Sequence, residues 1–255
     1  MIPQIFDIII VSWNNKDSLE TTINSFIKNS TFKHNILVHL NEGIDGSKEM
    51  LESKNITYTI SPTNVGLCIG ANNIVKKGTN SFVCLSDDDM YALPNWDINL
   101  INFYTKYFID EIVWLSSTML ERHNNTRTIN YSWINIDTIL NDYIELINTT
   151  HPYIMTQSTP AITQRSAWEK IGGYPEEFSP ALGSDDGICK ELWNIGCRNF
   201  VSVPDSLVYH FQGQSTSRVS SPNSDNRKKI FKNLYNIYPE EFFNEIKRGT
   251  IWTKK

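Results

Sequence analysis

The sequence predicts an α/β fold with a mostly parallel sheet and helices on both faces. Residues 6–12 form a continuous apolar run, as expected of a strand buried on both faces of a parallel sheet. Three similar runs follow, each separated from the last by a segment with helical periodicity. Each run ends in a polar loop that contains Gly or Asn. Such alternation is typical of βαβ units, in which helices cover the sheet.

The first half of the chain alternates predicted strands and helices. Asp17 and Ser18 are expected to cap the first helix, because short oxygen-bearing side chains accept hydrogen bonds from the free N–H groups at a helix start. The predicted strands are residues 6–12, 35–40, 56–60 and 82–85, and the predicted helices are residues 19–27, 47–52 and 63–77.

The second half loses its periodicity over residues 118–151, where only a weak helix at 136–147 is expected, and then recovers it. The other predicted helices are 94–108, 165–171 and 184–195, and the predicted strands are 112–116, 161–163, 200–203 and 206–210. Two short amphipathic helices are expected after residue 227. These patterns predict one domain over residues 1–225, with halves 1–117 and 118–225, and a helical extension over 226–255.

Composition and charge are those of an ordinary globular protein. Hydrophobic residues make up 40% and charged residues 20% of the chain. The formal net charge of −5 argues against a nucleic-acid-binding surface. No run approaches the roughly 18 apolar residues of a membrane-spanning helix. The four cysteines show no Cys-x-x-Cys pairing, so we expect buried free thiols and a cytoplasmic location, with peripheral membrane attachment as an alternative.

Three consecutive carboxylates, Asp87, Asp88 and Asp89, follow the fourth predicted strand. Side by side they repel one another. A divalent cation such as Mg²⁺ or Mn²⁺ would relieve that repulsion, because these ions prefer hard oxygen ligands. In open α/β sheets ligands gather at the carboxyl ends of the strands, which is where the triplet is expected. The alternative is a solvated acidic turn before the helix that follows Pro94.

Aromatic and polar residues follow the other three strands at the same edge of the sheet. Trp13, flanked by Ser12 and Asn14, could stack on a planar base, and its alternative is packing over the rim of the sheet. The polar loops after the second and third strands contribute Asn41, Asp45, Asn64 and Gly66. Together with the triplet, these loops suit a nucleotide laid across the sheet, with its base near Trp13 and its phosphates near the metal.

Two further acids and a histidine are candidates for chemistry. Asp185 and Asp186 open the predicted helix 184–195. Acids at a helix N-terminus are stabilised by the helix dipole, so one interpretation is structural and the other is a general base facing the same cleft. His210 ends the last predicted strand. Histidine completes oxygen-rich sites that take Mn²⁺, so His210 is a candidate metal ligand beside its structural alternative.

Taken in order, the motifs form a specific set although no single one is decisive. They are Ser12-Trp13-Asn14, residues 41–47, Asn64-Val65-Gly66, residues 85–89, 94–96 and 171–174, Ser184-Asp185-Asp186 with Trp193 and Gly196, and Tyr209-His210. This order resembles family 2 glycosyltransferases of the GT-A (Rossmann-like) fold, over residues 5–215.

The resemblance implies a reaction. A sugar would pass with inversion from a UDP- or GDP-linked donor to a hydroxyl group of a glycan or glycoconjugate. Mn²⁺ or Mg²⁺ would bind the leaving diphosphate. Residues 1–117 would bind the nucleotide sugar, and residues 118–225 would supply the acceptor pocket and the catalytic residues.

The resemblance also implies roles for individual residues. Trp13 matches the base-stacking aromatic residue. Asp87 and Asp89 match the D-x-D metal pair, with His210 as a further ligand. Counted back from Gly196, Asp185 matches the general base, and a register shifted by one residue would make it Asp186. The positions expected to line the nucleotide are Ser12, Trp13, Asn14, Asn41, Asn64, Gly66, Asp87 and Asp88.

Two other functions remain open. A nucleotidyltransferase has a similar sheet but usually carries a Gly-rich, basic first loop, which residues 12–15 lack. A non-catalytic nucleotide-sugar or glycan-binding relative is the second, and Ser184, where the family usually has an acid, leaves room for it.

Two segments are expected to act around the site. Tyr131, Trp133 and Tyr153 are candidate sugar-stacking surfaces, and core packing explains them equally well. Residues 212–226 have little apolar area with which to offset the entropy of ordering. One interpretation is that they order only over a bound donor, with Arg218 reaching the diphosphate, and the alternative is a surface linker to the C-terminal helices.

Overall fold

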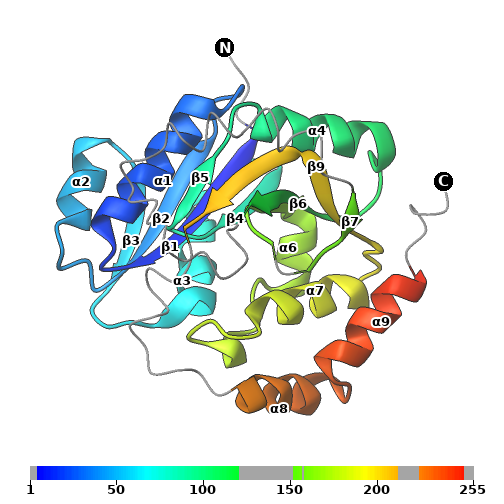
Figure 1. The fold of residues 1–255 in the computed structure, drawn as a ribbon. Coiled ribbons are helices and arrows are strands. Elements are labelled where there is room, and N and C mark those ends of the chain that lie inside the picture. Colours follow the sequence, from blue (N-terminus) through cyan, green and yellow to red (C-terminus); the bar gives the residue numbers. More distant parts are fainter. Residues whose placement is uncertain (1–4, 121–151, 157, 212–223, 250–255) are drawn as a thin grey trace, which may run out of the picture.

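A computed structural model of the chain describes residues 5–120, 152–156, 158–211 and 224–249 (Figure 1). The helix expected at 136–147 and residues 212–223 of the loop expected at 212–226, together with Tyr131, Trp133 and Arg218, lie outside these described residues. Residues 224–226 of that loop instead begin helix α8, Ser224–Tyr235. Among the described residues, no helix is long and apolar enough to cross a membrane.

The first half of the chain forms a parallel sheet, as predicted. Its strands lie in the order β3-β2-β1-β4, and every neighbouring pair is parallel. The register aligns Trp13 with Asn41, and Asn41 with Ser61, so these three strands end in one row. The bounds are Phe6–Trp13 for β1, Asn35–Asn41 for β2, Thr57–Ser61 for β3 and Phe82–Ser86 for β4.

The later strands extend this sheet beyond β4 in the order β8-β6-β9-β5, with β7 also paired to β9. β6 and β9 are parallel, and the other new pairs are antiparallel. The bounds are Met90–Ala92 for β5, Val113–Leu120 for β6, Tyr153–Ile154 for β7, Ala161–Gln164 for β8 and Asn199–His210 for β9.

Two strand predictions differ from the structure. The strands expected at 200–203 and 206–210 are one strand, β9, which shifts register against β6 between Ser117 and Thr118. The shift falls at Pro204, which has no N–H to donate to a ladder. β5 was not predicted, because three residues are too few to show a periodicity, and it exists through its pairing with the end of β9.

The helices fall where the sequence predicts them. The bounds are Lys16–Asn29 for α1, Ser47–Ser53 for α2, Gly66–Ile74 for α3, Trp96–Tyr107 for α4, Arg165–Ile171 for α6, Ser184–Asn194 for α7, Ser224–Tyr235 for α8 and Pro239–Gly249 for α9. The start of α1 is a correction. Asp17 lies inside its first turn, and the Lys16 N–H instead donates to Asp45 Oδ2 at 2.7 Å, so a side chain from the loop after β2 satisfies this end.

The sheet separates two apolar layers. Successive side chains of β1 point to opposite faces, so Ile8 and Ile10 pack in one cluster and Ile9 in the other. The first cluster includes α1, α2 and α4, and the second includes α3, α6, α7, α8 and α9. All four cysteines are buried and unpaired, which confirms that prediction.

Candidate active site

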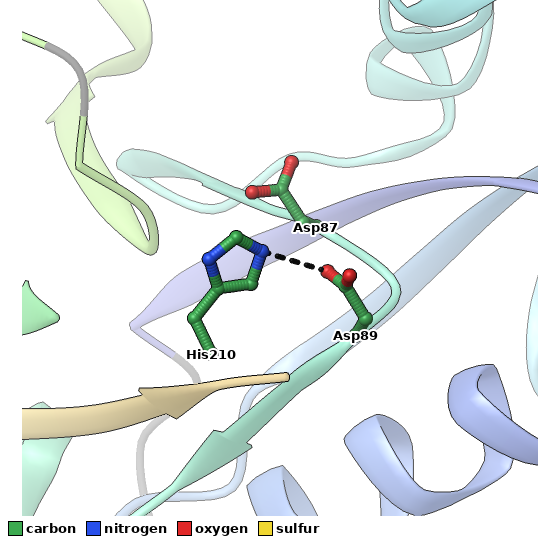
Figure 2. Close-up of side chains that lie close together, drawn as sticks. All are labelled: Asp87, Asp89 and His210. Carbon is green, nitrogen blue, oxygen red and sulfur yellow. Dashed lines mark ion pairs between the residues drawn. The ribbon is translucent and has the colours of Figure 1, made fainter. Parts of the chain in front are cut away.

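Asp87, Asp89 and His210 come together at the carboxyl edge of the sheet. One ligand atom from each lies within 4.8 Å of the others. His210 Nε2 is 3.2 Å from Asp89 Oδ1, and Figure 2 shows Asp87 beyond the same imidazole ring. The two acids follow β4 and the histidine ends β9, so residues more than 120 positions apart in sequence converge on one point.

The short strand β5 creates this convergence. It runs antiparallel to the end of β9, with Met90 opposite His210. The Phe211 N–H then donates to the Asp89 carbonyl at 3.0 Å. Backbone pairing therefore fixes the spacing between the acidic turn and the histidine before any ligand is considered.

The triplet divides its side chains between two environments. Asp88 is 5% exposed and accepts a 2.5 Å hydrogen bond from the Ser12 hydroxyl. Burial raises the pKa of Asp88 to about 7, and the negative charge of Asp89 adds to the rise while the Ser12 bond opposes it. Asp87 accepts a 2.7 Å bond from the Thr159 hydroxyl. Asp88 thus ties the turn to β1, and Asp87 and Asp89 stay beside His210.

Trp13 is held by a residue that the sequence analysis did not single out. Glu42 Oε2 accepts hydrogen bonds from the indole N–H of Trp13 at 3.0 Å and from the Asn14 side-chain amide at 2.8 Å. Glu42 has a φ of 67°, an uncommon conformation for a residue other than glycine. Because such strain is often kept at functional sites, the backbone supports Glu42 as part of this one. The feature of the sequence that could have identified Glu42 is its position directly after Asn41.

Trp13→Ala is expected to weaken binding of UDP or GDP in the presence of Mn²⁺ by about 1–3 kcal/mol, if the indole stacks on the base. Rim packing instead predicts a lower melting temperature with unchanged affinity. Calorimetric titration and thermal melting of one sample separate the two. Trp193→Ala is the matched control, because that half-buried indole packs against Phe242 in the second cluster. Normal affinity in Trp13→Ala would exclude stacking.

The other predicted nucleotide-lining residues have structural partners. Asn41 is 2% exposed, and its Oδ1 accepts from the Val65 N–H at 2.9 Å, which holds the loop before α3. Asn64 is exposed, and its Oδ1 accepts from the Gly66 N–H at 2.9 Å. A Cβ on Gly66 would lie 2.4 Å from Pro180 Cα, so only glycine fits there. Nucleotide contact by these residues stays a prediction.

Asp185 and Asp87 of the acidic turn line one small cleft. The cleft is lined by Asp87, Thr159, Tyr174 and Asp185 together with apolar residues of β1, β4 and α3. Burial raises the pKa of Asp185 to about 7, the negative charges of Asp87 and Asp186 add to the rise, and Arg227 opposes it. Within the described part of the chain, Asp185 makes no hydrogen bond or ion pair. Its carboxylate is therefore able to take a proton from an incoming group.

Asp186, the alternative base, has a different environment. It is 6% exposed, forms an ion pair with Arg227 of α8, and accepts a 3.5 Å bond from the Thr156 hydroxyl. The two acids at the start of α7 thus point to different neighbours. Of the predicted site residues, Asp87 and Asp185 line the cleft, and Asp89 and His210 lie beside Asp87. Trp13 and Asn14 lie at the end of β1, and Asp186 pairs with Arg227 of α8.

Solved structures share this fold. TarS 1–349 from S. aureus matches at 14% identity with a TM-score of 0.61, covering 91% of this chain and 71% of that chain. Its complex with UDP-GlcNAc matches at 13% identity with a TM-score of 0.63, covering 91% of this chain and 65% of that chain. The mannosyltransferase PcManGT from Pyrobaculum calidifontis, in complex with GDP-Man and Mn²⁺, matches at 16% identity with a TM-score of 0.55, covering 84% and 59%. At these identities, the likeness confirms the GT-A fold.

Sequence comparison gives the family. No curated protein matches the chain. The family model described as "Glycosyl transferase family 2" matches residues 7–172, which is more than half of the 255 residues and includes the acidic triplet. The chain therefore belongs to glycosyl transferase family 2.

Proposed function

We propose that the protein transfers a sugar from a nucleoside-diphosphate sugar to a hydroxyl acceptor, a glycan or glycoconjugate, with inversion at the anomeric carbon. The single observation that carries this proposal is that Asp87 belongs both to the cluster with Asp89 and His210 and to the cleft that Asp185 lines. A base close to a cation site is what displacement of a diphosphate by a hydroxyl group needs.

The residues of the cluster fit a divalent cation. Two carboxylates and one imidazole, with ligand atoms within 4.8 Å of one another, form a hard donor set with one nitrogen. Such a set suits Mn²⁺, and Mg²⁺ is the alternative when oxygen ligands dominate. The mannosyltransferase PcManGT in complex with GDP-Man and Mn²⁺ supports the same pairing of donor and metal. A bound cation would neutralise the negative charge that develops on the departing diphosphate.

The chain's own residues would then perform three tasks. Trp13 would stack on the base, with its indole orientation fixed by Glu42. Thr159 and the β5–β9 pairing would hold Asp87 and His210 in place through the bonds described above. Asp185 would accept the proton of the acceptor hydroxyl at its carboxylate oxygen, which makes that hydroxyl the nucleophile.

Asp185 is the better candidate for the base than Asp186. A general base must reach the proton that it removes, and its pKa should lie near the working pH. Asp185 lines the cleft with a pKa of about 7, whereas the carboxylate of Asp186 is engaged by Arg227. The structure thus favours the register that the sequence resemblance gave first.

A panel of nucleotide sugars tests the proposal. Incubation of the protein with UDP- and GDP-linked sugars, with Mn²⁺ and with a chelator, should release nucleoside diphosphate from one donor, and only with metal. NMR of the product formed with an acceptor then reports the anomeric configuration, and retention would contradict an inverting mechanism. Release of pyrophosphate from a nucleotide and a sugar phosphate would indicate a nucleotidyltransferase. Metal-dependent donor binding without turnover of any donor–acceptor pair would indicate a non-catalytic relative.

A further inference from the structure

Helix α8 contacts the first turn of α7 through Arg227, beside its apolar packing through Phe231 and the bond from the Tyr235 hydroxyl to the Gly187 carbonyl. The Arg227 guanidinium forms an ion pair with Asp186 at the start of α7, 41 positions earlier in the chain. The aliphatic part of the side chain lies over Gly183, where an added Cβ would come within 2.7 Å of Arg227 Cγ. Figure 1 shows α8 at the lower edge of the molecule, on the same side of the sheet as α7.

The Asp186 carboxylate joins three segments. One oxygen faces Arg227 of α8, and the other accepts the 3.5 Å bond from Thr156 in the loop before β8. Three residues later, the same loop places Thr159, which donates to Asp87. A continuous chain of contacts therefore runs from α8 through the first turn of α7 to the acidic turn.

Asp185 also interacts electrostatically with the residues of this chain of contacts. The acids that face Asp185 are Asp87 from the turn after β4 and Asp186 from its own helix, and the cation is Arg227 from α8. Among the described residues, the other titratable groups that interact with Asp185 are Tyr174 of the loop after α6, Cys68 of α3 and Cys189 of α7. Without the guanidinium, the two negative charges that act on Asp185 would lose this cation, and the buried Asp186 would lose the ion pair with Arg227.

We propose that Arg227 is a positioning residue: through Asp186 it fixes the first turn of α7 and residues 155–156 and 158–160 before β8, so that Asp185 lines the cleft together with Asp87. The catalytic unit thus extends to α8, beyond the sheet edge where the motifs lie. The value of this arrangement for transfer rests on the proposed role of Asp185, but the contacts themselves do not.

The alternative is that Arg227 only docks the C-terminal helices. Phe231, Phe242 and Ile246 are buried in the second core cluster, so α8 and α9 have apolar anchors of their own. Docking alone predicts that loss of the guanidinium loosens α8 and α9 and leaves the start of α7 unchanged. Positioning predicts instead that loss of the guanidinium loosens the start of α7.

Hydrogen exchange measured without donor or metal distinguishes the two. Arg227→Met should raise amide exchange in residues 183–188, 155–156 and 158–159. Lys228→Met is the matched control, because Lys228 is the next residue of α8 and pairs only with the exposed Glu240 among the ion pairs found in the described residues.

Arg227→Lys covers the case in which Arg227→Met does not fold. It keeps a cation but loses the planar fork, so exchange in the same residues should rise by less than in the methionine variant. If either folded variant shows exchange changes confined to α8 and α9, or a pattern identical to Lys228→Met, positioning by Arg227 is wrong. A protein that fails the nucleotide-sugar panel but shows the predicted exchange pattern would refute the proposed function and leave this inference standing.

Discussion

Asp185→Asn is expected to lower the rate of sugar transfer by on the order of 10²–10⁴-fold, the usual contribution of a general base. The substitution removes the proton-accepting oxygen and keeps the size of the side chain. Because Asp185 makes no hydrogen bond or ion pair among the described residues, little of the surrounding structure depends on its charge. Donor binding should therefore be unchanged, and calorimetric titration of the donor with Mn²⁺ beside single-turnover transfer measures both quantities.

The pH dependence gives this prediction a second signature. Burial and the nearby charges of Asp87 and Asp186 raise the pKa of Asp185 to about 7. A base acts in its deprotonated form, so the transfer rate of the wild-type protein should fall as the pH drops through about 7. The residual transfer rate of Asp185→Asn should not show this fall at low pH. A bound cation beside Asp87 would lower the midpoint, since it offsets one of the charges that raises it.

Asp186→Asn is the paired variant that decides the register. It keeps the Asp185 carboxylate but breaks the ion pair with Arg227, so it should lower the transfer rate by less than Asp185→Asn does, and the rate should fall at a lower pH than in wild type. If Asp186→Asn is inactive and Asp185→Asn is active, the base assignment is wrong. If both variants are active, the acids only stabilise the N-terminus of α7 through its dipole.

Much of the fold could be predicted from the sequence, because the local hydrophobic patterns agree with the strands observed in the sheet. Residues 8–11 are all apolar, and Ile8, Ile9 and Ile10 are buried in alternation on the two faces of the sheet; such runs are typical of central parallel strands. The acidic triplet was predictable for a related reason. Three adjacent carboxylates directly after a buried strand have no simple structural explanation, so their placement indicates the edge where ligands bind.

The parts that could not be predicted depend on contacts between distant residues. Thr159 supports Asp87 from 72 positions away, and Arg227 supports Asp186 from 41, and neither distance leaves a periodicity in the sequence. Glu42 resembles an ordinary turn residue until the structure brings Trp13 and Asn14 to the same carboxylate oxygen. The residues recognisable from the sequence are those that would touch ligands, and the residues that hold them in place became visible only in three dimensions.

Asp89→Ala is expected to abolish the metal-dependent part of donor binding while leaving the fold intact. In the wild-type protein Mn²⁺ should raise the melting temperature, because a ligand that binds only the folded state stabilises it. The variant keeps Asp87 and His210 but loses the acid that lies 3.2 Å from the imidazole. Loss of even an outer partner of a metal site typically costs about 10–100-fold in affinity, so removal of a direct ligand should cost at least as much.

Without metal, the same variant should melt no lower than wild type. The negative charge of Asp89 is one cause of the raised pKa of the buried Asp88, so its removal relieves a repulsion in the folded protein. Thermal melting with and without Mn²⁺, together with titration of UDP and GDP, measures both effects. Asp110→Ala, which removes an exposed acid after α4, is the matched control and should respond to Mn²⁺ as wild type does. An unchanged Mn²⁺ response in Asp89→Ala would exclude Asp89 as a metal ligand, whereas a large loss of stability without metal would show that the acid serves the fold through its bond to His210.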